Sequence, residues 1–343
     1  MTRSLSLLVL VTLVLLVPAA PAAADAAGPT HYRSELTAIV SEGEEPVPVE
    51  VEILGGDSFL VLRVEDGVQV EVPGYDGEPY VRFQPDGTVE VNDRAPTRWL
   101  NDERYGGQDV EIPTEADADA PPAWEQVADG GTYAWHDHRV HFMSPALPRQ
   151  VDPDAGDVQH VQDWEVPLRV DGEDARVQGT LGWVPGPSPA WPIGLGVVGL
   201  ALLLVLARAS QVWRQVAMLA GVAGGALVGA SATWGLPPGA DAEAAWVALP
   251  AIAGVAWLAG ILAGRGAEKR LGWLTSAAGV PLLAWAVPWA GALVRPIAPT
   301  PLPIGVVRAV VVLAVVVGVL GLIGLARAGL AATSLDRGDE VAD

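Results

Sequence analysis

Charged and apolar residues are segregated along this chain, and that separation limits its possible folds more than any other feature. Residues 25–190 hold 34 of the 41 acidic side chains and 10 of the 20 basic ones, so the rest of the chain carries a small positive excess. Half of all residues are hydrophobic, and most of this apolar bulk follows residue 191. Such a chain is not one soluble globule, although its 343 residues leave room for two domains.

Five apolar stretches follow residue 191, and each is near the roughly 20 residues that a helix needs to cross a bilayer. They cover residues 192–207, 215–236, 244–264, 271–294 and 303–326. We predict a bundle of about five transmembrane helices in contact with the lipid bilayer, ending in a cytoplasmic tail at 327–343. Six basic residues then flank cytoplasmic ends against one in an outer loop, as the positive-inside rule requires; the six are Arg208, Arg214, Arg265, Lys269, Arg270 and Arg327.

The first residues are typical of a secretory signal peptide. Arg3 supplies the positive charge, residues 5–17 form an apolar run, and three alanines at 22–24 offer a cleavage site. The run is shorter than a membrane span. We therefore predict a signal peptide at 1–24, with an uncleaved anchor as the alternative, and place the N-terminal domain outside the cell membrane.

Residues 25–184 are predicted to form an extracytoplasmic β domain. Short β-like runs alternate with turns rich in Gly, Pro and Asp; examples are 47–54, 58–64, 68–72, 80–83, 132–142, 164–170 and 175–184. This spacing favours an antiparallel sandwich of immunoglobulin-like shape. The chain has no cysteine, which excludes disulfides and thiolate metal sites. A Pro-rich linker at 185–191 leads to the bundle.

The predicted spans offer little chemistry. None has His, Asp, Glu or Lys in its middle, so proton transfer and haem ligation have no candidates there. Arg308 is interpreted as a side chain that snorkels to the outer surface. The tryptophans near the outer ends are interpreted as an aromatic belt; they are Trp191, Trp234, Trp246, Trp285 and Trp289.

Gly221, Gly225 and Gly229 recur on one helix face, where small residues let another helix approach closely. The other helix belongs either to the same chain or to a second copy, so self-association through these glycines stays open. The acidic exterior also leaves room for an envelope protein as a partner. It argues against nucleic acid, because binding a phosphate backbone needs clustered Lys and Arg.

Three of the five histidines fall within six residues, at His136, His138 and His141. On a strand the first two share a face at about 6.5–7 Å, a spacing that suits one shared ion. His141 joins them only if the strand ends or bulges near residue 140. Imidazole ligands without thiolate suit copper or zinc, and Met143 favours copper. Met143 and His160 are further tentative ligands.

Other interpretations of the cluster stay open. His136 and His138 could instead form a structural network with carboxylates or carbonyls. Asp137 could pair with Arg139 or orient an imidazole. Enzymatic catalysis is not expected, since no G-x-S-x-G motif accompanies the histidines. The sequence favours a membrane-anchored extracytoplasmic module that binds a transition metal, copper before zinc; the alternative is a cell-envelope interaction or assembly protein without metal.

Four runs of the exterior domain resemble a group of exported membrane proteins of high-GC Gram-positive bacteria. They are residues 74–83, 99–106, 121–124 and 133–143, and the Trp-His-Asp-His-Arg run from 135 is the most specific. The resemblance implies export, a β-rich exterior, a multi-span anchor and an association with extracytoplasmic copper handling. It implies no ligand set.

Overall fold

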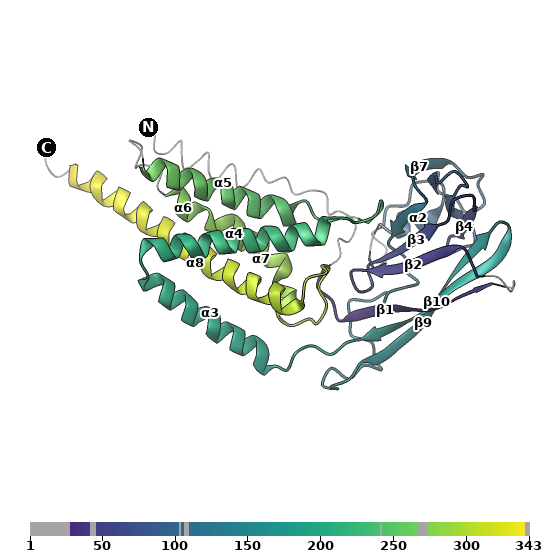
Figure 1. The fold of residues 1–343 in the computed structure, drawn as a ribbon, viewed down its shortest axis with the longest axis horizontal. Coiled ribbons are helices and arrows are strands. Elements are labelled where there is room, and N and C mark those ends of the chain that lie inside the picture. Colours follow the sequence, from purple (N-terminus) through teal and green to yellow (C-terminus); the bar gives the residue numbers. More distant parts are fainter. Residues whose placement is uncertain are drawn as a thin grey trace.

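The structure is a computed structural model that describes residues 28–41, 46–102, 104–105, 110–240, 242–265 and 273–339. An antiparallel β domain packs at one end of a helical bundle (Figure 1). Both parts are those that the sequence predicts. The predicted signal peptide at 1–24 lies outside the described residues and stays a prediction.

Ten strands of the described chain form two antiparallel sheets, with the orders β1-β10-β9-β4-β5-β6-β7 and β2-β3-β8. A short helix, α2 (Pro96–Leu100), follows β6. The strands are β1 (Tyr32–Ser41), β2 (Val49–Leu54), β3 (Phe59–Val64), β4 (Val70–Pro73), β5 (Pro79–Phe83), β6 (Val89–Asn92), β7 (Trp124–Ala128), β8 (Thr132–Trp135), β9 (Gln159–Val170) and β10 (Glu173–Trp183).

One apolar core lies between the two sheets. Leu60 and Leu62 of β3 enter it from the smaller sheet, and Val81 and Phe83 of β5 enter it from the larger one. Buried and exposed side chains alternate along most of β9 and β10, so that every second residue faces the core. The domain is therefore a sandwich, and β8 is one edge of the smaller sheet.

Five helical segments are long and apolar enough to cross a membrane in the described chain. The helices are α3 (Ala190–Arg208), α4 (Gln211–Thr233), α5 (Ala245–Arg265), α6 (Leu274–Ala277), α7 (Gly279–Trp289), the 3₁₀ turn η2 (Ala290–Leu293) and α8 (Ile304–Asp339). The fourth span consists of α6, α7 and η2. It breaks before Pro281, whose nitrogen carries no hydrogen to donate to the carbonyl of Ala277. α8 continues through most of the predicted tail.

The prediction of an aromatic belt at the outer span ends is wrong for three of the five tryptophans. Trp246, Trp285 and Trp289 are at most 5% exposed, and their rings pack together at centroid distances of 5.1 and 5.7 Å. Trp191 and Trp234 are exposed, as a belt requires. A sequence that is apolar all round a helix does not indicate which face meets lipid.

A proline explains one bond in this tryptophan cluster. Pro250 lies inside α5 and leaves the carbonyl of Trp246 without its helical donor. The indole nitrogen of Trp285 donates to that carbonyl at 3.0 Å. A Cβ at Gly229 would lie 2.0 Å from the same oxygen, so only glycine lets α4 approach here.

The glycine stripe on α4 packs within the chain. Gly221, Gly225 and Gly229 are all buried. A Cβ at Gly221 would lie 2.9 Å from Val317 of α8, and one at Gly225 would lie 3.2 Å from Pro250 of α5. Of the two partners that the sequence left open, the structure shows the helices of the same chain.

Arg308 also has an internal role. It is 9% exposed, and its guanidinium donates to the carbonyls of Ala292 at 2.9 Å and Arg295 at 3.2 Å. These carbonyls lie at the end of η2, where a helix leaves acceptors without donors. Arg308 therefore caps a helix end instead of snorkelling to the surface.

The β domain is hydrogen-bonded to the outer loops of the bundle. Thr30 and Ile297 exchange backbone hydrogen bonds of 3.0 and 3.2 Å. Ala134, on the edge strand β8, donates to the carbonyl of Pro238 in the α4–α5 loop at 2.8 Å. Gly239 follows with a φ of +85°, and a Cβ there would lie 2.0 Å from the oxygen of Ala134. The residues just before the histidine cluster are thus held by the bundle.

Candidate metal centre

The histidine cluster lies where the chain leaves the smaller sheet. β8 pairs with β3 up to Trp135 opposite Leu60, so the strand predicted at 132–142 ends seven residues early. The chain then turns, and Val140 donates its backbone N–H to the carbonyl of Asp137 at 3.1 Å. This early end meets the condition under which His141 can join the other two histidines.

A buried ion pair holds the turn. The Asp137 carboxylate accepts from the backbone N–H of Arg139 at 3.0 Å and from its guanidinium at 2.8 and 2.6 Å. It also accepts from the indole N–H of Trp135 at 2.8 Å. Burial raises the pKa of Asp137, but the charge and hydrogen bonds of Arg139 outweigh it and hold that pKa below its usual value. Both oxygens are occupied, so Asp137 pairs with Arg139 and does not orient an imidazole.

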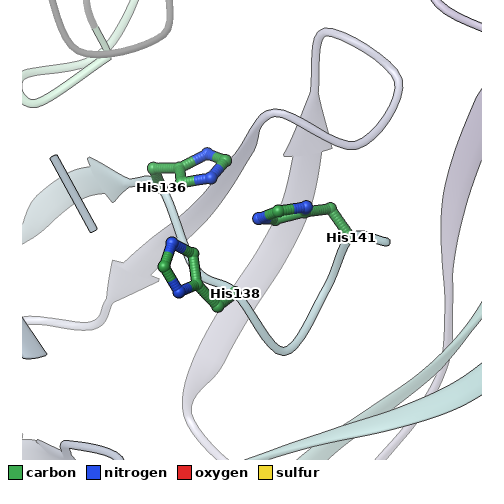
Figure 2. A group of neighbouring side chains, drawn as sticks. All are labelled: His136, His138 and His141. Carbon is green, nitrogen blue, oxygen red and sulfur yellow. The ribbon is translucent and has the colours of Figure 1, made fainter. Parts of the chain in front are cut away.

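The turn brings three imidazoles together (Figure 2). One ring nitrogen each from His136, His138 and His141 lies within 4.8 Å of the other two. The ring centroids of His136 and His141 are 4.4 Å apart. The centroid of His138 lies 5.5 Å from that of His136 and 5.4 Å from that of His141. Such a group of nitrogen donors could hold a metal ion.

Two of the imidazoles are fixed in one tautomer. Nδ1 of His136 lies 2.7 Å from the carbonyl oxygen of Ser58, and Nδ1 of His141 lies 3.2 Å from that of Phe142. A carbonyl only accepts, so each Nδ1 carries the hydrogen and each Nε2 carries a lone pair. Metal-ligating histidines use their second nitrogen in the same way.

The lone pairs of these two Nε2 atoms have no hydrogen-bond partner among the described residues, and both atoms are buried. His136 is 6% exposed and His141 is fully buried. Leaving a buried acceptor unpaired costs about 1–3 kcal/mol. Two such acceptors in one cluster are costly unless a cation or a donor completes them.

The same burial keeps both rings neutral. It lowers the pKa of His136 to about 4, although the bond to Ser58 opposes the shift. It lowers the pKa of His141 to about 2, with further contributions from His136 and the positive Arg104. Neutral imidazole is the form that ligates metals, so neither ring needs to lose a proton at neutral pH before binding.

His138 is the more accessible member of the cluster. Its ring stacks on Tyr75 at 5.6 Å and an interplanar angle of 11°. The Tyr75 hydroxyl accepts the backbone N–H of His138 at 2.8 Å and donates to Asn101. The guanidinium of Arg139 also lies over the Tyr75 ring, at 5.2 Å from its centroid. Tyr75 therefore positions His138.

A second buried ion pair lies beside the cluster. Arg104 contacts Asp57 at 2.5 Å, and Asp57 directly precedes the Ser58 whose carbonyl holds His136. Sequence reasoning assigned no role to Ser58, Tyr75 or Arg104. Tyr75 and Arg104 do lie in the runs that carry the resemblance, whereas nothing in the sequence marked Ser58, which reaches the site only through the pairing of β3 with β8.

His160 and Met143 are the other two predicted ligands. His160, on β9, is exposed and pairs through Nε2 with Asp163 at 2.7 Å. Met143 is 39% exposed. His160 does not belong to the group of converging ligand atoms in the described chain. Their roles as ligands stay predictions.

Among the described residues, the converging ligand atoms are ring nitrogens of three histidines. Imidazole nitrogens suit a transition metal of intermediate softness. The chain matches no family model, no curated protein and no solved structure. The case for its function therefore rests on the geometry of the cluster.

Proposed function

We propose that this chain is a membrane-anchored extracytoplasmic module that binds a transition metal through His136, His138 and His141, with copper favoured over zinc. The observation that carries the proposal is the pair of buried Nε2 lone pairs without partners. In a purely structural network these atoms would meet donors, because buried polar groups are nearly always hydrogen-bonded.

The two ring nitrogens of each buried histidine have different roles. Nδ1 meets a backbone carbonyl, which fixes the ring, and Nε2 is left for a ligand. A structural network accounts for the first contact only. A metal ion accounts for both, since it accepts the lone pairs of several imidazoles at once.

Charge favours copper in its reduced state. Two buried acids that the structure describes beside the cluster, Asp57 and Asp137, pair with Arg104 and Arg139, so their charge is already balanced before a cation is added. The cost of burying an ion rises with the square of its charge, so Cu(I) costs about a quarter as much as a divalent ion of the same size. Three imidazole ligands bring no negative charge to offset the larger cost for Zn²⁺.

Two features outside the cluster agree with this proposal. The basic residues beside one set of span ends support an exterior position of the β domain, by the positive-inside rule. The resemblance to exported proteins of high-GC Gram-positive bacteria adds an association with extracytoplasmic copper handling. Copper delivered outside the cytoplasm would then reach a site on the same side of the membrane.

The test is a titration of the purified full chain in detergent with Cu(I) under anaerobic conditions, against a chromophoric chelator. We expect one copper per chain and weaker binding of Zn²⁺. Replacing two ligands in a His136→Ala/His141→Ala variant should weaken copper binding by more than about 100-fold. This exceeds the loss expected when a residue that only hydrogen-bonds to a ligand is removed.

His160→Ala is the matched control, because it removes an exposed histidine outside the cluster. It should bind copper as the unaltered chain does. If the unaltered chain takes up no more copper than the double variant, while both keep the same unfolding midpoint, the metal proposal fails. An interaction or assembly role without metal would then be the remaining account.

A further inference from the structure

A groove of about 130 Å³ lies at the end of the bundle away from the β domain, where α3 ends and α4 begins (Figure 1). Its walls come from the first turns of α4, from α6 and from the second half of α8. The ends of four of the five spans in the described chain therefore meet at this groove. Span ends lie at the level of the lipid headgroups, so the mouth of the groove is at the membrane surface.

Two arginines line the groove, and both keep donors for a ligand. Arg327 of α8 is exposed and forms no hydrogen bond or ion pair with another described residue. Arg214 of α4 donates through Nε to the carbonyl of Leu206 at 3.0 Å and through one terminal nitrogen to that of Ala207 at 2.8 Å. These bonds fix the guanidinium beside the groove but do not neutralise its charge. Its other terminal nitrogen keeps two N–H donors.

The rest of the polar lining adds further donors and no opposing charge. None of the described lining residues is Asp or Glu. The side-chain oxygen of Gln215 accepts the indole N–H of Trp257, so its amide nitrogen is left as a donor. A Cβ at Gly324 would lie 2.4 Å from the hydroxyl oxygen of Ser276, so glycine leaves room for that hydroxyl. A phosphate group therefore finds two guanidinium groups here, whereas an ammonium group finds no anionic partner.

The groove changes from apolar to charged towards the end of the bundle. On α8 its lining runs from Val317 and Leu320 to Arg327, and on α4 it runs from Met218 to Arg214. A helix rises 1.5 Å per residue, so the lining on α8 covers about 15 Å. Free phosphate would use the charged part alone. A phospholipid matches both parts, since it joins a phosphate to an acyl chain.

We propose that this groove binds an anionic glycerophospholipid, with its phosphate on Arg214 and Arg327 and one acyl chain along Met218 and Val317. Basic pockets between membrane helices bind the headgroups of anionic lipids in this way. The lipid then bridges the ends of α4 and α8. This site needs no metal, so it stands or falls separately from the histidine cluster.

The test uses the full chain in phosphatidylcholine vesicles that contain a small share of a probe lipid with a diazirine in one acyl chain. The probe is either phosphatidylglycerol or phosphatidylcholine, so that the two probes differ only in the headgroup. After irradiation, mass spectrometry locates the adducts. Each arginine contributes about a fivefold preference for an anionic lipid, so the phosphatidylglycerol probe should label segments 211–218 and 317–327 about twentyfold to thirtyfold more than the other probe.

Arg327→Gln is the main variant, because this side chain has no described partner whose loss would disturb the fold. It should lower the phosphatidylglycerol preference about fivefold. An Arg214→Gln/Arg327→Gln variant should be labelled equally by the two probes. Arg208→Gln is the matched control, because Arg208 lies at the same end of the bundle but is not among the described lining residues. It should keep the full preference.

Equal labelling of the unaltered chain by the two probes, or a full preference that persists in Arg327→Gln, would overturn the proposal. Inorganic phosphate in large excess over the probe distinguishes the two sources of phosphate. A lipid site should keep its labelling, because the acyl chain adds contacts that phosphate lacks. Loss of the preference under these conditions would show that the groove binds free phosphate, which would contradict a lipid site.

Discussion

Among the described residues, the β domain and the bundle both bury polar atoms without partners, but only in the β domain do two such acceptors lie together. In the β domain they include the Nε2 lone pairs of His136 and His141, which accept. In the bundle they are the indole N–H groups of Trp246 and Trp289, which donate. Acceptors that converge favour a cation, whereas a buried N–H does not bind one. The type of unpaired atom, more than its burial, therefore indicates the class of ligand.

The two parts also differ in the charged side chains that they bury. The β domain buries the Asp57–Arg104 and Asp137–Arg139 pairs beside its cluster. In the described part of the spans, buried charge is confined to Arg308, which is bonded to backbone carbonyls. A rigid charged frame suits a site that holds an ion. The following predictions test this difference, beginning with the largest expected effect.

Asp137→Asn should be the most damaging single change. It leaves the buried Arg139 without its counter-charge, and breaking a buried pair costs about 3–5 kcal/mol. Chemical denaturation of the full chain in detergent, followed by tryptophan fluorescence, measures the loss. Asp163→Asn is the control, because its pair with His160 is exposed and should contribute at most about 1 kcal/mol. Equal losses in the two variants would show that the turn does not depend on the buried pair.

Acid should destabilise the metal-free protein through the buried histidines. Unfolded histidine titrates near 6.5, whereas the folded pKa of His136 is about 4 and that of His141 is about 2. Between these values the unfolded state binds more protons, so stability is complete above pH 6.5 and is lost as the pH falls towards 4. The expected loss by pH 4 is about 2–3 kcal/mol for each histidine.

The measurement is the unfolding midpoint of the metal-free chain at pH 7, 5 and 4. A His136→Asn variant lacks one of the two titrating groups, so its stability should fall less steeply over the same range. Identical pH dependence in the two proteins would mean that His136 is not held neutral by burial.

Gly239→Ala should loosen the contact between the bundle and β8. The new Cβ would lie 2.0 Å from the carbonyl oxygen of Ala134, at a φ of +85°. Gly235 also has a positive φ, of +77°, but has open space around it, so Gly235→Ala measures the backbone strain alone. We expect the Gly239 variant to lose about 1–2 kcal/mol more than the Gly235 variant in thermal unfolding. No difference between them would indicate that the loop does not hold the strand.

The smallest effect is expected for Trp289→Phe. This change removes a donor that has no partner in the described chain, so little hydrogen bonding is lost. Trp285→Phe removes the donor that serves the Trp246 carbonyl and leaves that carbonyl unpaired, which costs about 1–3 kcal/mol. Thermal unfolding in detergent compares the two variants. If Trp289→Phe were the more damaging, its N–H would have a partner that the structure does not show.

The sequence predicted the parts of the molecule that depend on local pattern. Apolar length identified five spans, and alternation with turn residues identified the sandwich. It could not predict that β8 ends at Trp135, because that end is set by pairing with β3 and by the Asp137–Arg139 turn. Nor could it separate buried from lipid-facing tryptophans, since helices that are apolar all round carry no periodic signal.

The candidate site was predictable in the same partial way. Close spacing brought His136, His138 and His141 to attention, and the structure brings their nitrogens together. Part of their surroundings comes from distant segments: Ser58 from the β2–β3 turn, Tyr75 from the β4–β5 turn. Contacts of such sequence separation leave no spacing to read, and the one with Ser58 decides the tautomer of His136.

The most direct test of the central claim is X-ray absorption spectroscopy of the copper-loaded full chain. The account predicts a first shell of imidazole nitrogens at about 2 Å, with the outer scattering that imidazole rings give. That imidazole signal should be lost in the His136→Ala/His141→Ala variant and kept in His160→Ala. A shell of oxygens without imidazole scattering, unchanged by the double variant, would contradict the account.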